Sequence, residues 1–130
     1  MAKREVISIS LPAKFHYSMG IKTEQFVFVA GIDADVDFRT GQAIKGIEAQ
    51  TRYCLETIKE ILETGGSSLE NVVSTTVYLQ HAEDFLKMNE VYTGFFPKDP
   101  PARATIPTGL LRPSMLVEIQ CISLRPAGQP

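Results

Sequence analysis

The strongest constraint on the fold is a change of hydrophobic period at Ile47. From there to Leu62, apolar residues recur every three or four positions and charged residues fill the positions between them. This pattern predicts an amphipathic helix that covers one face of a sheet, and Gly65 and Gly66 provide a left-handed end for it. A second apolar stripe predicts another helix, which Pro97 ends. The members of that stripe are Phe85, Met88, Tyr92, Phe95 and Phe96.

Strands are expected on both sides of each helix. The runs that predict them are "EVISIS", "FHYSMGIKT", "QFVFVAGID", "NVVSTTVYLQ", "RATIPTGLL" and "LVEIQCISL". The predicted order is therefore β-β-β-α-β-α-β-β. We expect one α+β domain over residues 1–130, with a mixed sheet and both helices on one of its faces. The last two strands are joined through "LRPS" and are expected to pair as a hairpin.

Composition narrows the possible functions. The 130 residues carry a net charge of −2, and thirteen Lys and Arg are scattered among fifteen acids, so no basic face for nucleic acid is predicted. No apolar run reaches membrane-spanning length and the start does not resemble a signal peptide, so we expect a cytoplasmic protein with no membrane partner. His16 and His81 stand alone, which predicts no metal site, and Cys54 and Cys121 are expected to be buried free thiols.

The sheet face away from the helices should be neither fully apolar nor fully solvated. Its expected residues are Ser74, Thr76 and Tyr78 on one strand and Leu116, Glu118, Gln120 and Ile122 on the last strand. A semi-polar sheet face of this kind is typical of a subunit interface. We therefore expect a homo-oligomer with its sheets inside.

Two charged residues stand in the last two strands, where charge is rare unless a partner or a ligand satisfies it. In the expected hairpin Arg103 lies opposite Ile122, about 13 Å along the strands from Glu118. The residues that would then share one face are Arg103, Thr105, Glu118 and Gln120. The residues alone leave open whether Arg103 and Glu118 are structural ions or the two ends of a small ligand site.

An ordered set of motifs resembles the Rid (YjgF-like) family, the reactive-intermediate deaminases that act on enamines and imines. "PPARATIP" and "LVEIQCISLRP" are similar to its C-terminal signature, and "KMNEVYTGFF" to its Asn-x-x-Tyr-x-x-Phe-Phe segment. "NVVSTTVYL" is similar to one of its strands, and "VFVAGIDAD" to its strand followed by a glycine loop. The resemblance covers nearly the whole chain. It implies a chorismate-mutase-like fold and a homotrimer with three clefts between its subunits.

The resemblance also implies roles for particular residues. Arg103 falls on the arginine that grips the substrate carboxylate, and Glu118 on the acid that holds a water. The substrate-binding positions would be Tyr17, Ala30, Gly31, Asn89 and Thr105. The chain departs from the common form at three places: Met19 replaces Gln, Ala30 replaces Ser and Thr105 replaces Cys. These departures leave the lining of the implied cleft less polar.

The implied activity is a cofactor-independent hydrolysis of enamine or imine intermediates of amino-acid metabolism to 2-keto acids and ammonia, of the 2-iminobutanoate or 2-iminopropanoate type. Such a substrate is already electrophilic, so orientation and a placed water suffice. The alternative is a non-catalytic trimeric binder of small carboxylate metabolites, which needs Arg103 but not Glu118. A third hypothesis, an endoribonuclease, is disfavoured by the acidic composition and the lack of a histidine pair.

Overall fold

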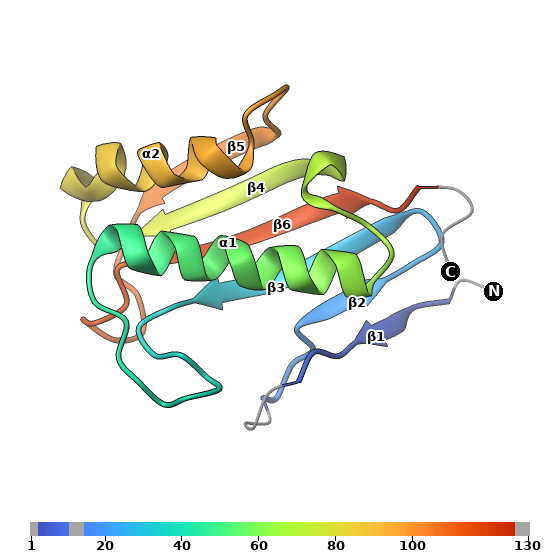
Figure 1. Ribbon diagram of the computed structural model, residues 1–130, viewed down its shortest axis with the longest axis horizontal. Helices are drawn as coiled ribbons and strands as arrows, with labels where there is room; N and C mark the ends of the chain where they lie inside the picture. The colour runs from blue at the N-terminus through green and yellow to red at the C-terminus, as the bar shows by residue number, and fades with distance from the viewer. Residues whose placement is uncertain (1–2, 11–14, 127–130) are drawn as a thin grey trace.

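The computed structural model describes residues 3–10 and 15–126. Within them, a six-stranded mixed sheet carries two helices on one face (Figure 1). The strands are β1 Glu5–Ile7, β2 Gly20–Lys22, β3 Phe26–Asp33, β4 Val72–Leu79, β5 Ala102–Pro107 and β6 Val117–Leu124, the helices are α1 Ile47–Thr64 and α2 Phe85–Phe95, and short 3-10 turns span Leu69–Asn71 and Ala82–Asp84. The predicted order of elements and the α+β layering are confirmed.

Helix α1 covers the sheet with the face that its period predicted. Its most deeply buried apolar side chains, each at most 1% exposed, are Cys54, Leu55, Ile58, Ile61 and Leu62. The helix ends in a Schellman motif, in which the Ser67 N–H donates to the Leu62 carbonyl at 2.8 Å and the Gly66 N–H donates to the Glu63 carbonyl at 3.2 Å. Gly66, with φ 82°, takes the left-handed position. No helix in the described ranges is long and apolar enough to cross a bilayer.

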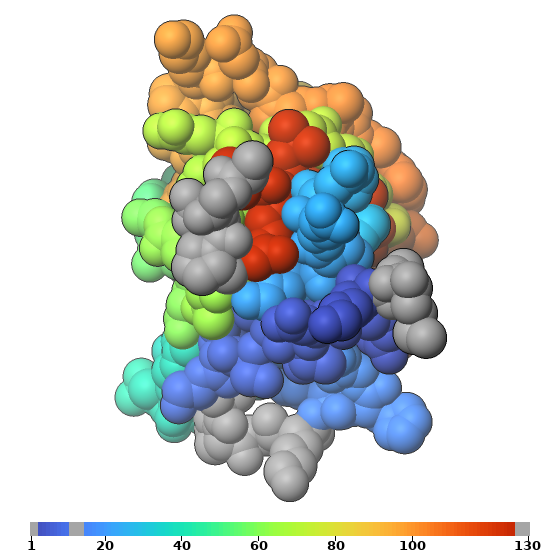
Figure 2. All heavy atoms as spheres, turned by 90° about the vertical axis from the view of Figure 1, so that its right-hand side faces the viewer, coloured from blue at the N-terminus to red at the C-terminus, as the bar shows by residue number. Residues whose placement is uncertain are grey.

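The strand order is β1-β2-β3-β6-β4-β5, and it corrects one prediction. Strand β6 runs antiparallel to both β3 and β4, whereas β5 runs parallel to β4 at the edge of the sheet. The expected hairpin of the last two strands is therefore wrong, because β4 lies between them. The cause is α2, which returns the chain from the end of β4 so that β5 lies parallel to it. An end-on view shows the N-terminal strands and the α2–β5 segment at opposite ends of the molecule (Figure 2).

The loop from β5 to β6 is fixed by a polar network built on two buried side chains, Asp35 and Gln50. The Arg112 guanidinium donates two hydrogen bonds of 2.8 Å to the Asp35 carboxylate, and the Ser114 hydroxyl donates a third of 2.8 Å. The guanidinium holds the pKa of Asp35 below its usual range. The buried Gln50 amide donates to the Ser114 carbonyl and accepts from the Leu116 N–H, both at 2.9 Å. These contacts set where β6 begins and therefore its register.

A β-bulge decides which side chains of β3 leave the core. Val29 pairs with Cys121 and Ile32 pairs with Ile119, so two residues of β3 stand opposite the single residue between those partners on β6. The bulge shifts the alternation of faces by one position. Ile32 is consequently buried in the core at 1% exposure, and Asp33 emerges on the face away from the helices.

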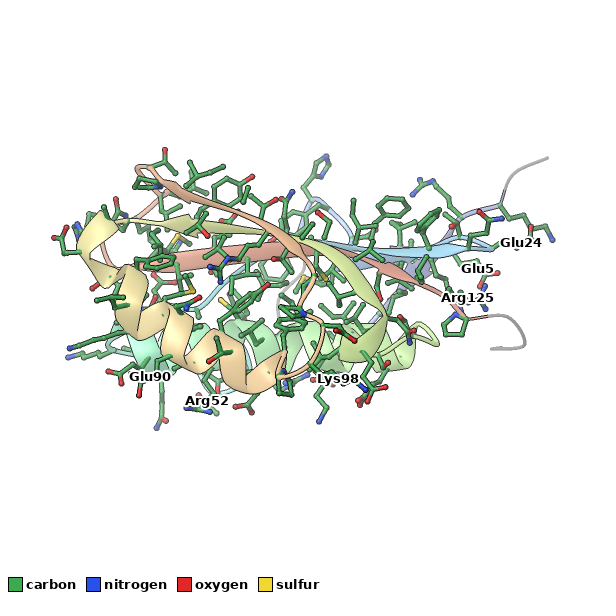
Figure 3. All side chains as sticks on the ribbon, turned by 90° about the horizontal axis from the view of Figure 1, so that it is seen from above. Glu5, Glu24, Arg52, Glu90, Lys98 and Arg125 are labelled. Atoms are coloured by element: carbon green, nitrogen blue, oxygen red, sulfur yellow. The ribbon has the colours of Figure 1, made fainter. Side chains whose placement is uncertain are left out.

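No helix of the described residues covers the sheet face opposite α1 and α2, which we call the open face (Figure 3). One end of it is apolar, where Phe28, Ile122 and Leu124 are 42%, 36% and 44% exposed. The other end is polar and carries a cross-strand row of Asp33, Glu118 and Tyr78. The predicted semi-polar face is therefore present.

Candidate functional site

Arg103 lies between β5 and α2, on the helix-covered side of the sheet. Its direct partner in β4 is Thr75, which faces the core and is 2% exposed. The Arg103 Nη1 donates to the Asn89 Oδ1 at 2.7 Å. The guanidinium carbon lies 4.6 Å from the ring centroid of Tyr92 and 5.6 Å from that of Phe85. We call Arg103, Asn89, Phe85 and Tyr92 the arginine cluster; it holds a half-buried guanidinium in a defined plane.

The arginine cluster has the properties of a carboxylate receptor. Among the described residues, no carboxylate forms an ion pair with Arg103. Its remaining N–H donors can therefore meet an anion from outside, and a guanidinium binds a carboxylate through two parallel hydrogen bonds. The Tyr92 ring that contacts the guanidinium is itself held in place. Its hydroxyl forms a hydrogen bond of 2.7 Å with the Thr75 hydroxyl.

Two other predicted positions lie with Arg103. Asn89 is in direct contact with it, as described above. Thr105 is two residues further along β5, on the same face, beside Val77 of β4. Thr105 is half-buried, and its hydroxyl adds a small polar group beside the arginine cluster.

Glu118 lies on the open face, on the other side of the sheet from Arg103. It pairs directly with Asp33 of β3 and with Tyr78 of β4. Burial raises the pKa of the Glu118 carboxyl, and the charge of Asp33 raises it further. The expectation that Arg103 and Glu118 share one face is wrong. Through Tyr78 of β4, Glu118 is in register with Ile106 of β5. Arg103 lies three residues from Ile106 and therefore on the other face. The Cα atoms of Arg103 and Glu118 are about 14 Å apart, because they are separated by two strand spacings across the sheet and by three residues along it. Their side chains point to opposite sides of the sheet.

Gly31 lies directly against the Glu118 carboxyl group. A Cβ on Gly31 would stand 3.0 Å from the carboxyl carbon and closer still to Oε2, so only glycine fits there without displacing Glu118. The neighbouring Ala30 belongs to the same bulge, and its N–H donates to the Met19 carbonyl at 2.9 Å. Met19 is buried at 8% exposure, so its side chain belongs to the core and not to the lining of a cleft.

Tyr17 lies near the same carboxyl groups. Its ring stacks on Phe15 with centroids 5.3 Å apart, and Phe15 in turn packs edge-on against Phe38 at 5.3 Å. Burial raises the pKa of the Tyr17 hydroxyl, and the charges of Asp33 and Glu118 raise it further. The side chain is nevertheless 52% exposed. It can therefore reach a ligand that approaches the open face.

Sequence reasoning did not single out Asp33. Its Oδ1 is buried and has no hydrogen-bond partner among residues 3–10 and 15–126. Burial raises the pKa of the Asp33 carboxyl, the charge of Asp35 raises it further, and the charge of Arg112 opposes both. Gly31 within β3 is the sequence feature that could have predicted the position of Asp33. A glycine inside a strand often marks a bulge, and a bulge moves the following side chains to the other face of the sheet. We call Asp33, Glu118 and Tyr17 the carboxyl cluster.

Other groups in the described ranges offer less chemistry. Cys54 and Cys121 are buried free thiols, as predicted. Burial raises the pKa of Cys121 to about 12 and that of Cys54 well above its usual value, so neither thiol is a ready nucleophile. The residues 3–10 and 15–126 contain no group of three or more His, Cys, Asp or Glu that could hold a metal ion.

One hollow on the described surface lies away from both clusters. It measures about 670 Å³, sits between the C-terminal ends of α1 and α2, and contains none of the predicted site residues. Charges of both signs line it, from Lys59 and Lys98 to Glu63 and Asp99. The arginine cluster and the carboxyl cluster therefore remain two separate surfaces of one chain.

Comparison with known proteins gives a consistent result. Residues 8–124 match the family model described as Endoribonuclease L-PSP. A RutC family protein of Pyrococcus horikoshii is 44% identical over 110 residues, which are 84% of this chain and 86% of that protein. The chloroplastic Reactive Intermediate Deaminase A of Arabidopsis thaliana is 36% identical over 124 residues, 93% of this chain and 66% of that protein. The crystal structure of E. coli TdcF with bound serine matches with a TM-score of 0.85 and 28% identity, over 94% of this chain and 99% of that one.

Proposed function

Because the chain belongs to the Rid, YjgF and RutC family, whose model is described as Endoribonuclease L-PSP, we propose that it hydrolyses enamine or imine intermediates of amino-acid metabolism to 2-keto acids and ammonia. The observation that carries the proposal is the Arg103 guanidinium, held in a fixed plane with no carboxylate partner in the described chain. Two relatives support it: one is named a reactive intermediate deaminase, and the other holds serine, an amino acid that carries a carboxylate.

In the proposed reaction the arginine cluster orients the substrate and Glu118 handles the water. Arg103 binds the carboxylate of a 2-imino acid by two parallel hydrogen bonds, which fixes the position and rotation of the neighbouring C=N carbon. The Glu118 carboxylate accepts a hydrogen bond from a water and takes its proton as the water oxygen bonds to that carbon. The nitrogen then leaves as ammonia, and the 2-keto acid remains. Because the C=N carbon is already electrophilic, we propose no cofactor.

We propose that two copies of the chain complete each site. In a 2-imino acid the carboxylate carbon is bonded directly to the C=N carbon, whereas Arg103 and Glu118 of one chain diverge on opposite faces of the sheet. A second copy that lays its β5 edge and α2 against the open face of the first would bring the two groups together. The exposed Phe28 and Ile122 support this arrangement, since apolar groups on an open sheet face favour burial by a partner. The resemblance to the family implies that three copies close into a homotrimer.

The direct test of the proposed activity is ammonia release from imines generated in the assay from different amino acids. The wild-type protein is expected to release ammonia faster than the uncatalysed control, with a preference for small 2-imino acids such as 2-iminopropanoate and 2-iminobutanoate. If no member of the panel is turned over, the deaminase proposal fails.

Substitution of Gly31 by alanine is expected to lower turnover through Glu118. The new Cβ would push the Glu118 carboxyl away from its position, and a displacement of about 1 Å can lower a rate by as much as ~10²-fold. Gly109→Ala is the matched control, since a Cβ there meets no atom within 4 Å. Steady-state ammonia release should fall in Gly31→Ala and not in Gly109→Ala. Equal rates in the two variants would show that the position of Glu118 does not matter.

A trimeric binder of carboxylate metabolites is the second candidate. The observation that favours it is the reduced polar lining, because Met19 is buried in the core and Ala30 has no hydroxyl where the common family form has serine. Such a binder needs the arginine cluster and not Glu118, so it would bind 2-keto acids and release no ammonia. An endoribonuclease, which the family model's description names, is not proposed: His16 and His81 lie on segments separated by β3 and β6, and the net charge is −2.

A further inference from the structure

Two acidic side chains stand directly opposite each other at the polar end of the open face. Asp33 of β3 and Glu118 of β6 are register partners in an antiparallel pair. Directly opposed residues on one face have Cβ atoms about 4.5–5.5 Å apart, and like charges in that position destabilise a sheet. The bulge at Gly31 produces this arrangement, because without it the Asp33 side chain would point into the core.

Little in the described surroundings of Asp33 balances its charge. No described residue forms a hydrogen bond with its buried Oδ1. Arg112, whose charge lowers the pKa of Asp33, already donates two hydrogen bonds of 2.8 Å to Asp35, whose own carboxylate adds a further negative charge. The pKa of Asp33 is raised by burial first and by Asp35 second, despite Arg112.

The other groups that face the pair are two phenol hydroxyls and a thiol. Tyr17 approaches from the segment before β2, and Tyr78 flanks Glu118 from β4. The Cys54 thiol lies beneath on α1 and donates to the Ile32 carbonyl at 3.0 Å. Burial, with the charges of Asp33 and Glu118 as further causes, raises the pKa of that thiol. Both carboxyls therefore gain more from sharing a proton than from ionising together.

Resting on the deaminase activity proposed above, we propose that Asp33 is a positioning residue that shares one proton with Glu118, so that the pair remains singly protonated at pH values where an isolated carboxyl is ionised. The raised pKa of each carboxyl agrees with this, since two interacting acids lose their protons in two coupled steps.

A singly protonated pair can serve both halves of imine hydrolysis. When the water oxygen bonds to the C=N carbon, the C=N electron pair moves to nitrogen, and the Glu118 carboxylate accepts the proton that the water loses. The pair then returns a proton to the nitrogen. As the C–N bond breaks, the carbinol oxygen forms the C=O bond and gives its own proton to the pair, which passes a second proton to the nitrogen. Ammonia leaves, and the pair ends with the single proton with which it began.

The test is a carboxyl titration by NMR, which does not depend on turnover. In wild type, the side-chain carboxyl carbons of Asp33 and Glu118 should each report both titration steps of the pair. In Asp33→Asn, which keeps the side-chain shape, the pKa of Glu118 should fall because a negative neighbour has gone. Glu56→Gln, the same charge change on the exposed side of α1, is the matched control and should leave Glu118 unmoved. Independent single titrations in wild type, or an unmoved Glu118 in Asp33→Asn, would overturn the proposal.

The pH dependence of ammonia release gives the functional readout. The acidic limb of the kcat/KM profile should move to lower pH in Asp33→Asn, by the same amount as the pKa of Glu118 measured by NMR. A limb that stays in place while the pKa of Glu118 moves would overturn the role of Asp33 in the reaction. Wild-type protein without activity would instead remove the proposed function, and the NMR titration would still decide whether the proton is shared.

Discussion

Replacement of Arg103 by alanine is expected to weaken the binding of carboxylate ligands at least ~10-fold, because a charge-assisted hydrogen bond contributes about 1.5–3 kcal/mol. Arg103→Lys keeps the charge but loses the planar fork and its contact with the Tyr92 ring, so it should also bind more weakly than wild type. The measurement is calorimetric titration with pyruvate or 2-oxobutyrate, which carry the carboxylate and cannot be deaminated.

Arg52→Ala is the matched control for Arg103→Ala. Arg52 is exposed on α1, on the outer side of the helix layer (Figure 3). Its removal should leave the affinity unchanged. The assembly of the Arg103 variants should also remain intact, since Arg103 forms no ion pair within the described chain. Equal affinity in wild type and both Arg103 variants, or an alanine variant that no longer assembles, would identify Arg103 as a structural ion.

Glu118→Gln is expected to lower turnover by a factor on the order of 10² or more, the usual contribution of a positioned acid or base. Glutamine keeps the shape and hydrogen bonding of the side chain but cannot take the proton from water. The affinity for 2-oxobutyrate should barely change, because the carboxylate is bound by the arginine cluster. Comparison of ammonia release with calorimetry on the same protein separates the two effects, and unchanged turnover would make Glu118 a bystander.

Loss of stability should not confuse the result for Glu118→Gln. The pKa of Glu118 is raised in the folded chain above the unfolded value of about 4.3, by burial and then by Asp33. The folded state therefore binds the proton more tightly than the unfolded state, and stability falls as pH rises from the unfolded pKa through the folded one. Glutamine is uncharged and avoids that cost, so Tm at neutral pH should be equal to or higher than that of wild type.

The sequence was sufficient to predict the helices, because a period of three to four residues depends only on the chain itself. The apolar stripe from Ile47 to Leu62 became α1, and the glycines after it became a Schellman end. The semi-polar open face was predictable for the same reason, since alternation along β4 and β6 assigns each residue to a side. Which strand lies beside which is a tertiary property, and that is where prediction failed.

The pairing of β5 decided the geometry of the site. A short connection between the last two strands favoured a hairpin, but the crossover through α2 places β5 parallel to β4 instead. Arg103 thereby points toward the helices, and Glu118 points the other way. The position of Asp33 was equally unpredictable. It depends on one extra residue in β3, which reverses the faces to which the following side chains point. Neither feature leaves a periodic signal in the sequence.

A mixing experiment tests whether Arg103 of one subunit and Glu118 of another complete one deaminase site. Arg103→Ala and Glu118→Gln subunits, each expected to be much less active than wild type alone, can be mixed in equal amounts, unfolded and refolded together, with sedimentation used to confirm that trimers form. If each site takes one residue from each of two neighbours, about one quarter of the sites will contain both native groups, so ammonia release should recover to about one quarter of the wild-type rate. Mixed trimers no more active than either variant alone, beside an active wild type, would contradict the account.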